Sequence, residues 1–254
     1  MTARRFIATG LDLSGTTVEV RGDLFRHMAT VLRLKIDTRV ILTDGCGTEC
    51  GGIIRELGRD HLVVDIMERS TPAMQGKNLR ITLYQGLPKG EKMELILQKA
   101  TELGVSAVVP FPAERSITRI PSDRQEERLR RWRRIVEEAA RQSGRADVPN
   151  VRLAGGMVEL GREAGHQMKL LLWEAEQATS LRETLAAQPQ LTDIAVIVGP
   201  EGGITSGEAE IARKGGFIPV TLGRRILRTE TAGIALVAIL QYLYGDLGER
   251  GEPS

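Results

Sequence analysis

Hydrophobic and polar positions alternate along the first part of the chain, as far as about Arg69. Segments with a period of two lie at residues 18–22, 39–45, 50–57 and 61–70, separated by glycine and aspartate residues. Such alternation predicts half-buried β-strands joined by turns. We therefore expect residues 1–70 to form a small antiparallel β-barrel.

A different pattern follows the polar segment 71–78, which has no periodicity and is predicted to be a linker. Apolar runs lie at residues 80–85, 107–112, 169–174 and 194–199, with helical patterns between them. Continuous apolar runs are typical of parallel strands buried on both faces. The pattern predicts an α/β domain over residues 79–245, with about five or six strands, and a frayed polar tail at 246–254.

Helix starts are marked by a serine or threonine with a glutamate or glutamine three positions later. The pairs are Ser122 with Gln125, Ser180 with Glu183, and Thr205 with Glu208. Each pair predicts a capping box, in which the two side chains satisfy backbone N–H groups at the start of a helix.

The last helical segment, residues 231–244, carries apolar residues on nearly every side. A helix without a polar face is expected to be buried all round. Either a second subunit or an unusual chain path must then enclose it.

Two loops precede helices in the second half of the chain. The first, Gly199–Glu208 (GPEGGITSGE), directly follows an apolar strand. Glycine lets a backbone approach a ligand closely, and open α/β sheets bind ligands at the carboxyl ends of their strands. It lacks the Gly-Lys-Ser/Thr of a phosphate-binding loop. The alternatives are a ligand-binding turn and a tight turn without a ligand.

The second loop, Leu222–Ala232 (LGRRILRTETA), places Arg224, Arg225, Arg228 and Glu230 next to the apolar helix. Charges beside buried apolar surface are costly unless they have partners. A ligand or substrate would supply such partners, whereas ordinary surface ion pairs are the alternative.

Composition narrows the functional classes only slightly. The chain has 35 basic and 33 acidic residues, so its formal net charge is only +2. Basic residues concentrate between Arg4 and Lys35 and again at 128–134. Basic surface of this kind is suited to binding a polyanion. For the second cluster, the glutamates nearby also fit a solvated helix face. Cys46 and Cys50 are too few for a disulfide framework or a closed zinc site, and we expect no metal.

The N-terminus lacks the apolar run of a signal peptide, and no run of about 18 apolar residues occurs. We expect a cytoplasmic protein without a membrane span.

The two loops, in this order, resemble those of the SPOUT class of S-adenosylmethionine-dependent RNA methyltransferases. Further motifs resemble the ribosomal RNA small subunit methyltransferase E family, which methylates N3 of a uridine in 16S rRNA. These motifs are Arg4 with Arg5, residues 27–35 (HMATVLRLK), 87–104 (LPKGEKMELILQKATELG), Arg115 with Ser116, and 138–143 (EAARQS). The resemblance covers nearly the whole chain.

The resemblance implies a PUA-like β-barrel that binds RNA, and a catalytic domain that is a homodimer with a trefoil knot. The knot would enclose the apolar helix. S-adenosylmethionine would be held by the two loops. The implied cofactor residues are Gly199, Glu201, Gly202, Gly203, Leu222, Gly223, Ile226, Leu227, Thr231 and Ala232.

For catalysis we expect Arg228 to stabilise negative charge on the uracil oxygens, and Glu230 to act as a base or to organise the loop. Glu201 is a candidate for holding the cofactor's amino group. Binding of 16S rRNA or the small subunit would fall to Arg4, Arg5, Arg26, His27, Arg33, Lys89, Lys92 and Arg115.

The chain departs from the family pattern at Ile204-Thr205, where Phe-Ser is common, and at Met28, where a second histidine is expected. Met28 removes that histidine as a candidate, and His27 is expected only to contact the substrate. Two other functions stay open: methylation of another RNA, such as tRNA, and RNA binding or ribosome assembly without catalysis.

Overall fold

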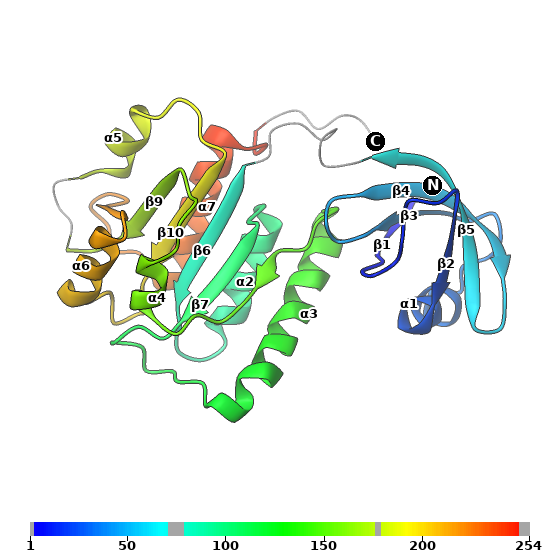
Figure 1. Ribbon diagram of the computed structural model, residues 1–254, viewed down its shortest axis with the longest axis horizontal. Helices are drawn as coiled ribbons and strands as arrows, with labels where there is room; N and C mark the ends of the chain where they lie inside the picture. Colours follow the sequence, from blue (N-terminus) through cyan, green and yellow to red (C-terminus); the bar gives the residue numbers. More distant parts are fainter. Residues whose placement is uncertain (1–2, 71–78, 176–178, 249–254) are drawn as a thin grey trace. The chain divides into compact units, whose positions relative to one another are not determined.

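The computed structural model describes residues 3–70, 79–175 and 179–248 (Figure 1). The predicted linker, residues 71–78, lies outside the described residues, as does the end of the predicted tail. The chain forms two compact units, residues 1–76 with 140–148, and residues 77–139 with 149–254.

The first unit is built on a five-stranded sheet with the order β1-β3-β4-β5-β2. Its strands are β1 (Arg4–Ile7), β2 (Thr17–Arg21), β3 (Arg39–Thr43), β4 (Glu49–Leu57) and β5 (His61–Ser70). The short helix α1 (Gly22–Arg26) and the π-helical turn η1 (His27–Val31) follow β2. Apolar residues from the strands and from this helical segment form one core, which includes Phe6, Val20, Phe25 and Met28.

The predicted all-antiparallel sheet is wrong at one pair, because β1 runs parallel to β3. A parallel pair needs a long crossover connection, and the chain between these strands includes β2, α1 and η1. The short strand β1 has no alternation long enough to be recognised from sequence. It contributes the buried Phe6 to the core.

Residues 140–148 belong to the first unit although they follow its other residues by some 60 positions in the sequence. The backbone N–H of Val148 donates to the carbonyl of Gly45 at 2.9 Å, and the Thr43 hydroxyl donates to the carbonyl of Ala146. These bonds fasten the segment to the turn that follows β3.

The second unit contains the predicted parallel sheet, with six strands in the order β11-β9-β10-β6-β7-β8. They are β6 (Arg80–Gly86), β7 (Ala107–Phe111), β8 (Asn150–Val151), β9 (Met168–Leu172), β10 (Asp193–Val198) and β11 (Ile218–Val220). Every neighbouring pair is parallel. All six residues of β10 are buried, as its continuous apolar run predicts.

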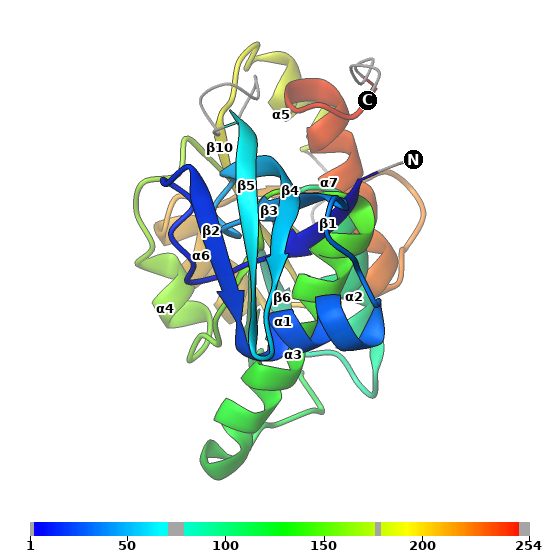
Figure 2. The same ribbon diagram turned by 90° about the vertical axis from the view of Figure 1, so that its right-hand side faces the viewer.

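Helices cover both faces of this sheet (Figure 2). On one face, α2 (Lys92–Glu102) packs beside α7 (Thr229–Tyr244), and on the other α4 (Met157–Gly161) packs beside α6 (Ser206–Lys214). Tyr84, Phe111 and Phe217 lie in the core on the α4 and α6 side. The remaining helices are α3 (Gln125–Ser143) and α5 (Leu181–Ala186).

Two of the three predicted capping boxes form, at Ser180 with Glu183 and at Thr205 with Glu208. The prediction for Ser122 is wrong. A 3-10 turn, η3 (Ser122–Arg124), precedes α3, and its N-cap is Pro121, which makes no side-chain capping bond.

Helix α7 is buried on one face only, so the expectation of burial on every side is wrong for the single chain. Its inner residues include Gly233, Leu236, Val237 and Leu240. On the outer side, Ile239 is 38%, Tyr242 69% and Leu243 49% exposed. The sheet and α2 can cover only one face of the helix, which leaves an apolar row uncovered.

The C-terminal part of α7 is fastened to the end of α2 through Gly104. Gln241 Nε2 donates to the Gly104 carbonyl at 2.9 Å. Gly104 has a φ of +85°, and a Cβ there would lie 2.5 Å from Gln241 Nε2. A side chain at this position would therefore both strain the backbone and displace the glutamine.

We predict that Gly104→Ala destabilises the protein by about 2–4 kcal/mol, because the left-handed backbone cost of ~1–2 kcal/mol adds to a lost buried hydrogen bond. Gly144→Ala is the matched control. Gly144 has a φ of +75° but no atom within 4 Å of its would-be Cβ, so only the backbone cost remains. Urea denaturation measures both, and equal shifts would contradict the role of the Gln241 contact.

Candidate functional site

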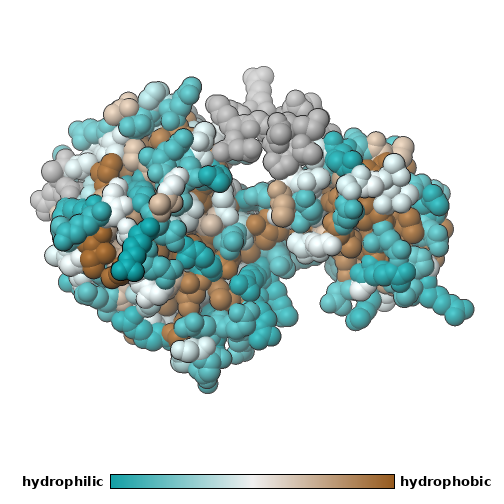
Figure 3. Space-filling model, viewed as in Figure 1, coloured by the Kyte–Doolittle hydropathy of each residue, from teal (hydrophilic) through white to brown (hydrophobic). Residues whose placement is uncertain are grey.

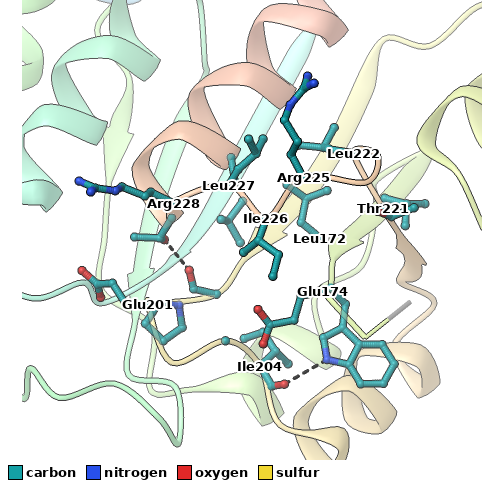
Figure 4. A pocket seen from close by; sticks show the side chains of 18 of the residues that line it. Leu172, Glu174, Glu201, Ile204, Thr221, Leu222, Arg225, Ile226, Leu227 and Arg228 are labelled. Atoms are coloured by element: carbon teal, nitrogen blue, oxygen red, sulfur yellow. Dashed lines mark hydrogen bonds between the residues drawn. The ribbon is translucent and has the colours of Figure 1, made fainter. Parts of the chain in front are cut away.

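The carboxyl ends of β9, β10 and β11 open onto a cavity of about 800 Å³ (Figure 4). Its walls come from three segments: the end of β9, the loop after β10 and the loop before α7. Lining residues from these segments include Leu172, Trp173, Glu174, Val198, Gly199, Glu201, Gly203, Ile204, Thr221, Leu222, Ile226, Leu227 and Ala232. Strand ends of this kind are the usual ligand sites of open α/β sheets.

The first loop turns back sharply after Val198. The N–H of Gly203 donates to the carbonyl of Pro200 at 2.9 Å. Gly203 has a φ of +73°, and a Cβ there would lie 2.5 Å from a carboxylate oxygen of Glu174. The backbone conformation therefore favours glycine here, and any side chain would displace the Glu174 carboxylate.

Hydrogen bonds through the buried side chains of Gln85 and Thr229 join the second loop to the first. Gln85 Nε2, from β6, donates to Thr229 Oγ1 at 2.9 Å, and Thr229 Oγ1 donates to the carbonyl of Gly199 at 2.5 Å. The end of β9 is joined in the same way, because Trp173 Nε1 donates to the carbonyl of Ile204 at 3.0 Å (Figure 4).

Side chains of the second loop divide into apolar and cationic groups. Ile226 projects into the cavity and is 87% exposed (Figure 4). The guanidinium groups of Arg225 and Arg228 point away from it in Figure 4. Within the described parts of the chain, Arg224, Arg225 and Arg228 have no ion-pair partner. Of the four charges expected next to the helix, the three arginines are therefore exposed, whereas Glu230 is largely buried.

An ion-pair cluster lies at the edge of the cavity. Lys92 Nζ is 2.8 Å from Glu201 Oε1 and 3.5 Å from Glu230 Oε2, and the backbone N–H of Lys89 donates to Glu201 Oε2 at 3.2 Å. Glu230 is 14% exposed, and its Oε2 is buried without a hydrogen bond. The cluster joins the start of α2 to both loops.

The ion pair changes the pKa of both its members. The hydrogen bond with Glu201 raises the pKa of Lys92 above its ordinary value. Partial burial opposes ionisation of Glu201, but the bonds from Lys92 and from backbone N–H groups outweigh it and lower the pKa of that carboxyl. Both groups are therefore charged at neutral pH.

Most of the predicted cofactor residues line the cavity. Gly202 and Thr231 do not. Gly202 instead directs its carbonyl to Arg115 Nη1, at 3.1 Å, and Thr231 is exposed on the first turn of α7.

Sequence reasoning missed Leu172, Trp173, Glu174 and the buried pair Gln85 and Thr229. Glu174 follows the end of an apolar strand. Open α/β sheets bind ligands at the carboxyl ends of their strands, so the same reasoning applied to β9 would have identified this residue.

The predicted RNA-binding residues are divided between the two units. Arg4, Arg26 and Arg33 are exposed on the first unit, while Arg5 pairs with Glu49. The His27 ring makes an edge contact with Phe6, at 6.2 Å between centroids. On the second unit, Lys89 and Arg115 are exposed, and Lys92 belongs to the ion-pair cluster described above.

The second basic segment lies on the solvent side of α3. Arg128, Arg130, Arg131, Arg133 and Arg134 are all exposed. Arg131 pairs with Glu94 at 2.7 Å, and Arg133 with Glu126 at 3.4 Å. Hydrophilic side chains cover the visible side of this helix (Figure 3). These ion pairs favour the solvated-face interpretation of the segment.

Cys46 is exposed and Cys50 is buried, and both are free thiols. In the portion of the chain that the structure describes, no group of three His, Cys, Asp or Glu residues is arranged to hold a metal ion. Over the same residues, no helix is both long and apolar enough to cross a membrane.

Family models match both units of the chain. A model described as an RNA methyltransferase domain matches residues 75–241, and one described as an RNA methyltransferase PUA domain matches residues 20–67. These matches include both loops of the cavity and most strands of the first unit.

Individual relatives match over nearly the full length. The ribosomal RNA small subunit methyltransferase E of Mycobacterium bovis is 34% identical over 94% of this chain and 92% of its own length. A Neisseria gonorrhoeae enzyme of the same name, with S-adenosyl methionine bound, is 35% identical with a TM-score of 0.83, covering 96% and 99% of the two chains. A Legionella pneumophila protein with bound SAM is 31% identical with a TM-score of 0.81, covering 95% and 98%.

Identity at this level across both chains, together with the domain matches, defines the family. This chain belongs to the ribosomal RNA small subunit methyltransferase E family of RNA methyltransferases.

Proposed function

We propose that this protein transfers a methyl group from S-adenosylmethionine to N3 of a uridine in 16S ribosomal RNA. The proposal rests on the cavity that two hydrogen-bonded loops form at the strand ends. The relatives of this chain are named ribosomal RNA small subunit methyltransferase E. With 16S rRNA as the substrate, we infer that the protein acts in the cytoplasm.

The cavity fits a nucleoside cofactor in size and in chemistry. About 800 Å³ lies within the range of ~300–1,000 Å³ of ligand pockets. Apolar side chains of Leu222, Ile226 and Leu227 suit a flat adenine ring, and backbone groups of Gly199 and Gly203 suit hydrogen bonding to its edge. Glu201 and Gly223 complete the wall. Gly202 and Thr231 would act by shaping the loops.

Bound S-adenosylmethionine supplies an electrophilic methyl group, so the protein has to align the uracil nitrogen and accommodate the loss of its proton. Alignment alone lowers such a barrier by about 7–11 kcal/mol. We assign Arg228 to the charge that develops on the uracil oxygens, because it is an exposed residue of the cavity rim and has no ion-pair partner among the described residues. Its guanidinium, which points away from the cavity in Figure 4, would have to turn toward the bound uracil.

For Glu230 we favour the organising role over that of a base. Its carboxylate is largely buried and lies 3.5 Å from Lys92 Nζ, a contact that also brings in Glu201. Lys92 is then a residue of the cofactor wall, and phosphate contacts fall to Lys89 and Arg115, with Arg4, Arg5, Arg26, His27 and Arg33 on the first unit.

At the level of the fold, we propose that the second unit is a SPOUT domain with a trefoil knot and that the first is a PUA-like barrel. The bond from Thr229 to Gly199, which brings two separate loops together next to β6, supports the knot. The single core within the five-stranded sheet and the PUA match support the barrel. The domain limits 1–70 and 79–245 stay predictions.

We further propose a homodimer whose interface contains the outer face of α7. The exposed apolar row of Ile239, Tyr242 and Leu243 supports it, since a second copy would remove this row from water.

Labelled cofactor tests the function directly. We expect methyl transfer to N3 of a uridine in 16S rRNA, offered either naked or in assembled small subunits, and none to tRNA. Cofactor at about 100 times its dissociation constant should stabilise the fold by about 2.7 kcal/mol. Methyl transfer to tRNA alone would contradict 16S rRNA as the proposed substrate. A thermal shift with the cofactor but without any methyl transfer would favour a non-catalytic RNA-binding protein.

Arg228→Ala is expected to lower kcat by about 10²–10³-fold, the usual loss when a donor to developing negative charge is removed. Cofactor affinity, measured by calorimetry, should stay unchanged. Lys214→Ala is the control, because Lys214 is an exposed cation at the far end of α6. A wild-type rate for Arg228→Ala would refute the assigned role.

Tyr242→Glu should shift the protein from dimer to monomer in sedimentation velocity, because it places a charge within the apolar row. Met67→Glu changes a comparably exposed residue of the first unit and should leave the dimer intact. Dissociation by both variants, or by neither, would argue against an interface on α7.

A further inference from the structure

A second groove lies on the same edge of the parallel sheet as the cofactor cavity. It follows the carboxyl ends of β7 and β8, whereas the cavity follows β9, β10 and β11, and the sheet order places these strand groups on opposite sides of β6. The groove consists of two hollows of about 640 and about 290 Å³, which share Pro112, Arg119 and Gly155. Nothing in the proposed methyl transfer uses it.

The loop after β7 connects the groove to the cofactor loop. The backbone N–H of Glu114 donates to Glu208 Oε1 at 2.9 Å, and Arg115 Nη1 donates to the carbonyl of Gly202 at 3.1 Å. On its other side, Thr118 Oγ1 donates to the carbonyl of Pro88 at 2.8 Å. One fastened loop therefore forms a wall of the groove and supports the cofactor loop.

Two arginines give the groove its charge. Arg119 and Arg162 line it and are exposed, and neither has an ion-pair partner within the described residues. Arg119 donates only a long bond, 3.4 Å, to the carbonyl of Glu114. Unpaired guanidinium groups are suited to phosphate, which they bind through two parallel hydrogen bonds.

The acidic residues of the groove are engaged, with one exception. Glu208 belongs to the capping box of α6. Glu159 accepts from Arg152 Nη1 at 3.0 Å and from the N–H of Gly155 at 2.7 Å. The carboxylate of Glu114 is exposed, and it is an acceptor for the amino or imino groups that nucleobases present.

Backbone and apolar groups form the rest of the groove. Gly155 and Gly156 contribute no side chains, and Gly156 has a φ of +143°, which favours glycine. Val158, on α4, is 53% exposed and lines the groove with Met157. Unstacked bases of single-stranded RNA stack on aromatic side chains or on arginine guanidinium planes, and the groove offers guanidinium groups beside its apolar surface.

We propose that this groove binds a ribonucleotide that neighbours the target uridine in single-stranded RNA. Its phosphate would lie against Arg119 and Arg162, and its base over Gly155, Gly156 and Val158. The inference rests on the proposed function, since the groove is the next hollow along the sheet edge for a strand that delivers a base to the cavity. It assigns substrate positioning to a part of the domain that does not touch the cofactor.

The test is the binding of a short single-stranded RNA that contains the target uridine, to Arg119→Ala, Arg162→Ala and the double variant. We expect the double variant to bind at least about tenfold more weakly. The slope of log K against log salt should fall by about 0.7 for one lost phosphate contact on single-stranded RNA. Cofactor affinity should be unchanged, and the KM for RNA should rise more than kcat falls.

Lys214→Ala removes one exposed cation from the opposite edge of the sheet, where α6 ends, and it should change neither RNA affinity nor the salt slope. Wild-type RNA affinity in the double variant would overturn the proposal that the groove binds RNA. Inorganic phosphate or a free mononucleotide that binds through the two arginines, with RNA affinity unaffected, would also overturn it. Because affinity is measured without methyl transfer, a wild-type protein that binds RNA through the groove but methylates nothing would contradict the proposed function alone.

Discussion

A buried chain of hydrogen bonds from Gln85 through Thr229 to Gly199 is the constraint on which the site depends. It connects the end of β6, the start of α7 and the loop after β10. Gln85 and Thr229 are buried and Gly199 is half-buried, and a buried polar group without a partner costs about 1–3 kcal/mol. The two loops therefore meet in one arrangement. Gly233 contributes by letting α7 pass over Gln85, whose Oε1 would lie 3.3 Å from a Cβ at that position.

Around this chain of bonds, both halves of the sheet edge carry exposed arginines. The half formed by β9, β10 and β11 carries the cavity, which Arg224, Arg225 and Arg228 line together with glycines and aliphatic side chains. The half formed by β7 and β8 carries the groove with Arg119 and Arg162, and none of these arginines has an ion-pair partner among the described residues. Lys92 lies at the cavity's edge and forms ion pairs with the carboxylates of Glu201 and Glu230. Cations elsewhere on the edge therefore remain available for a polyanion.

Helix α7 has an apolar outer side that the single chain leaves exposed to water. Its inner residues pack on the sheet and on α2, and the same composition continues on its outer side, where Tyr242 and Leu243 face water. A helix of 16 residues that begins at the cofactor loop and ends in an apolar surface links the site directly to the proposed subunit contact.

Features that local physics controls could be predicted from the amino-acid sequence. Continuous apolar runs were enough for β6, β7, β9 and β10, glycine and capping residues for the loop after β10, and the family motifs for the two cavity loops. Local patterns did not contain the parallel pairing of β1 with β3, the transfer of residues 140–148 to the first unit, or the partnership of Gln85 with Thr229. Nor did they show that Lys92 pairs with two glutamates while Arg119 and Arg162 have no ion-pair partner in the described part of the chain. Those outcomes depend on contacts between residues far apart in the chain, and only tertiary packing decides which side chains meet.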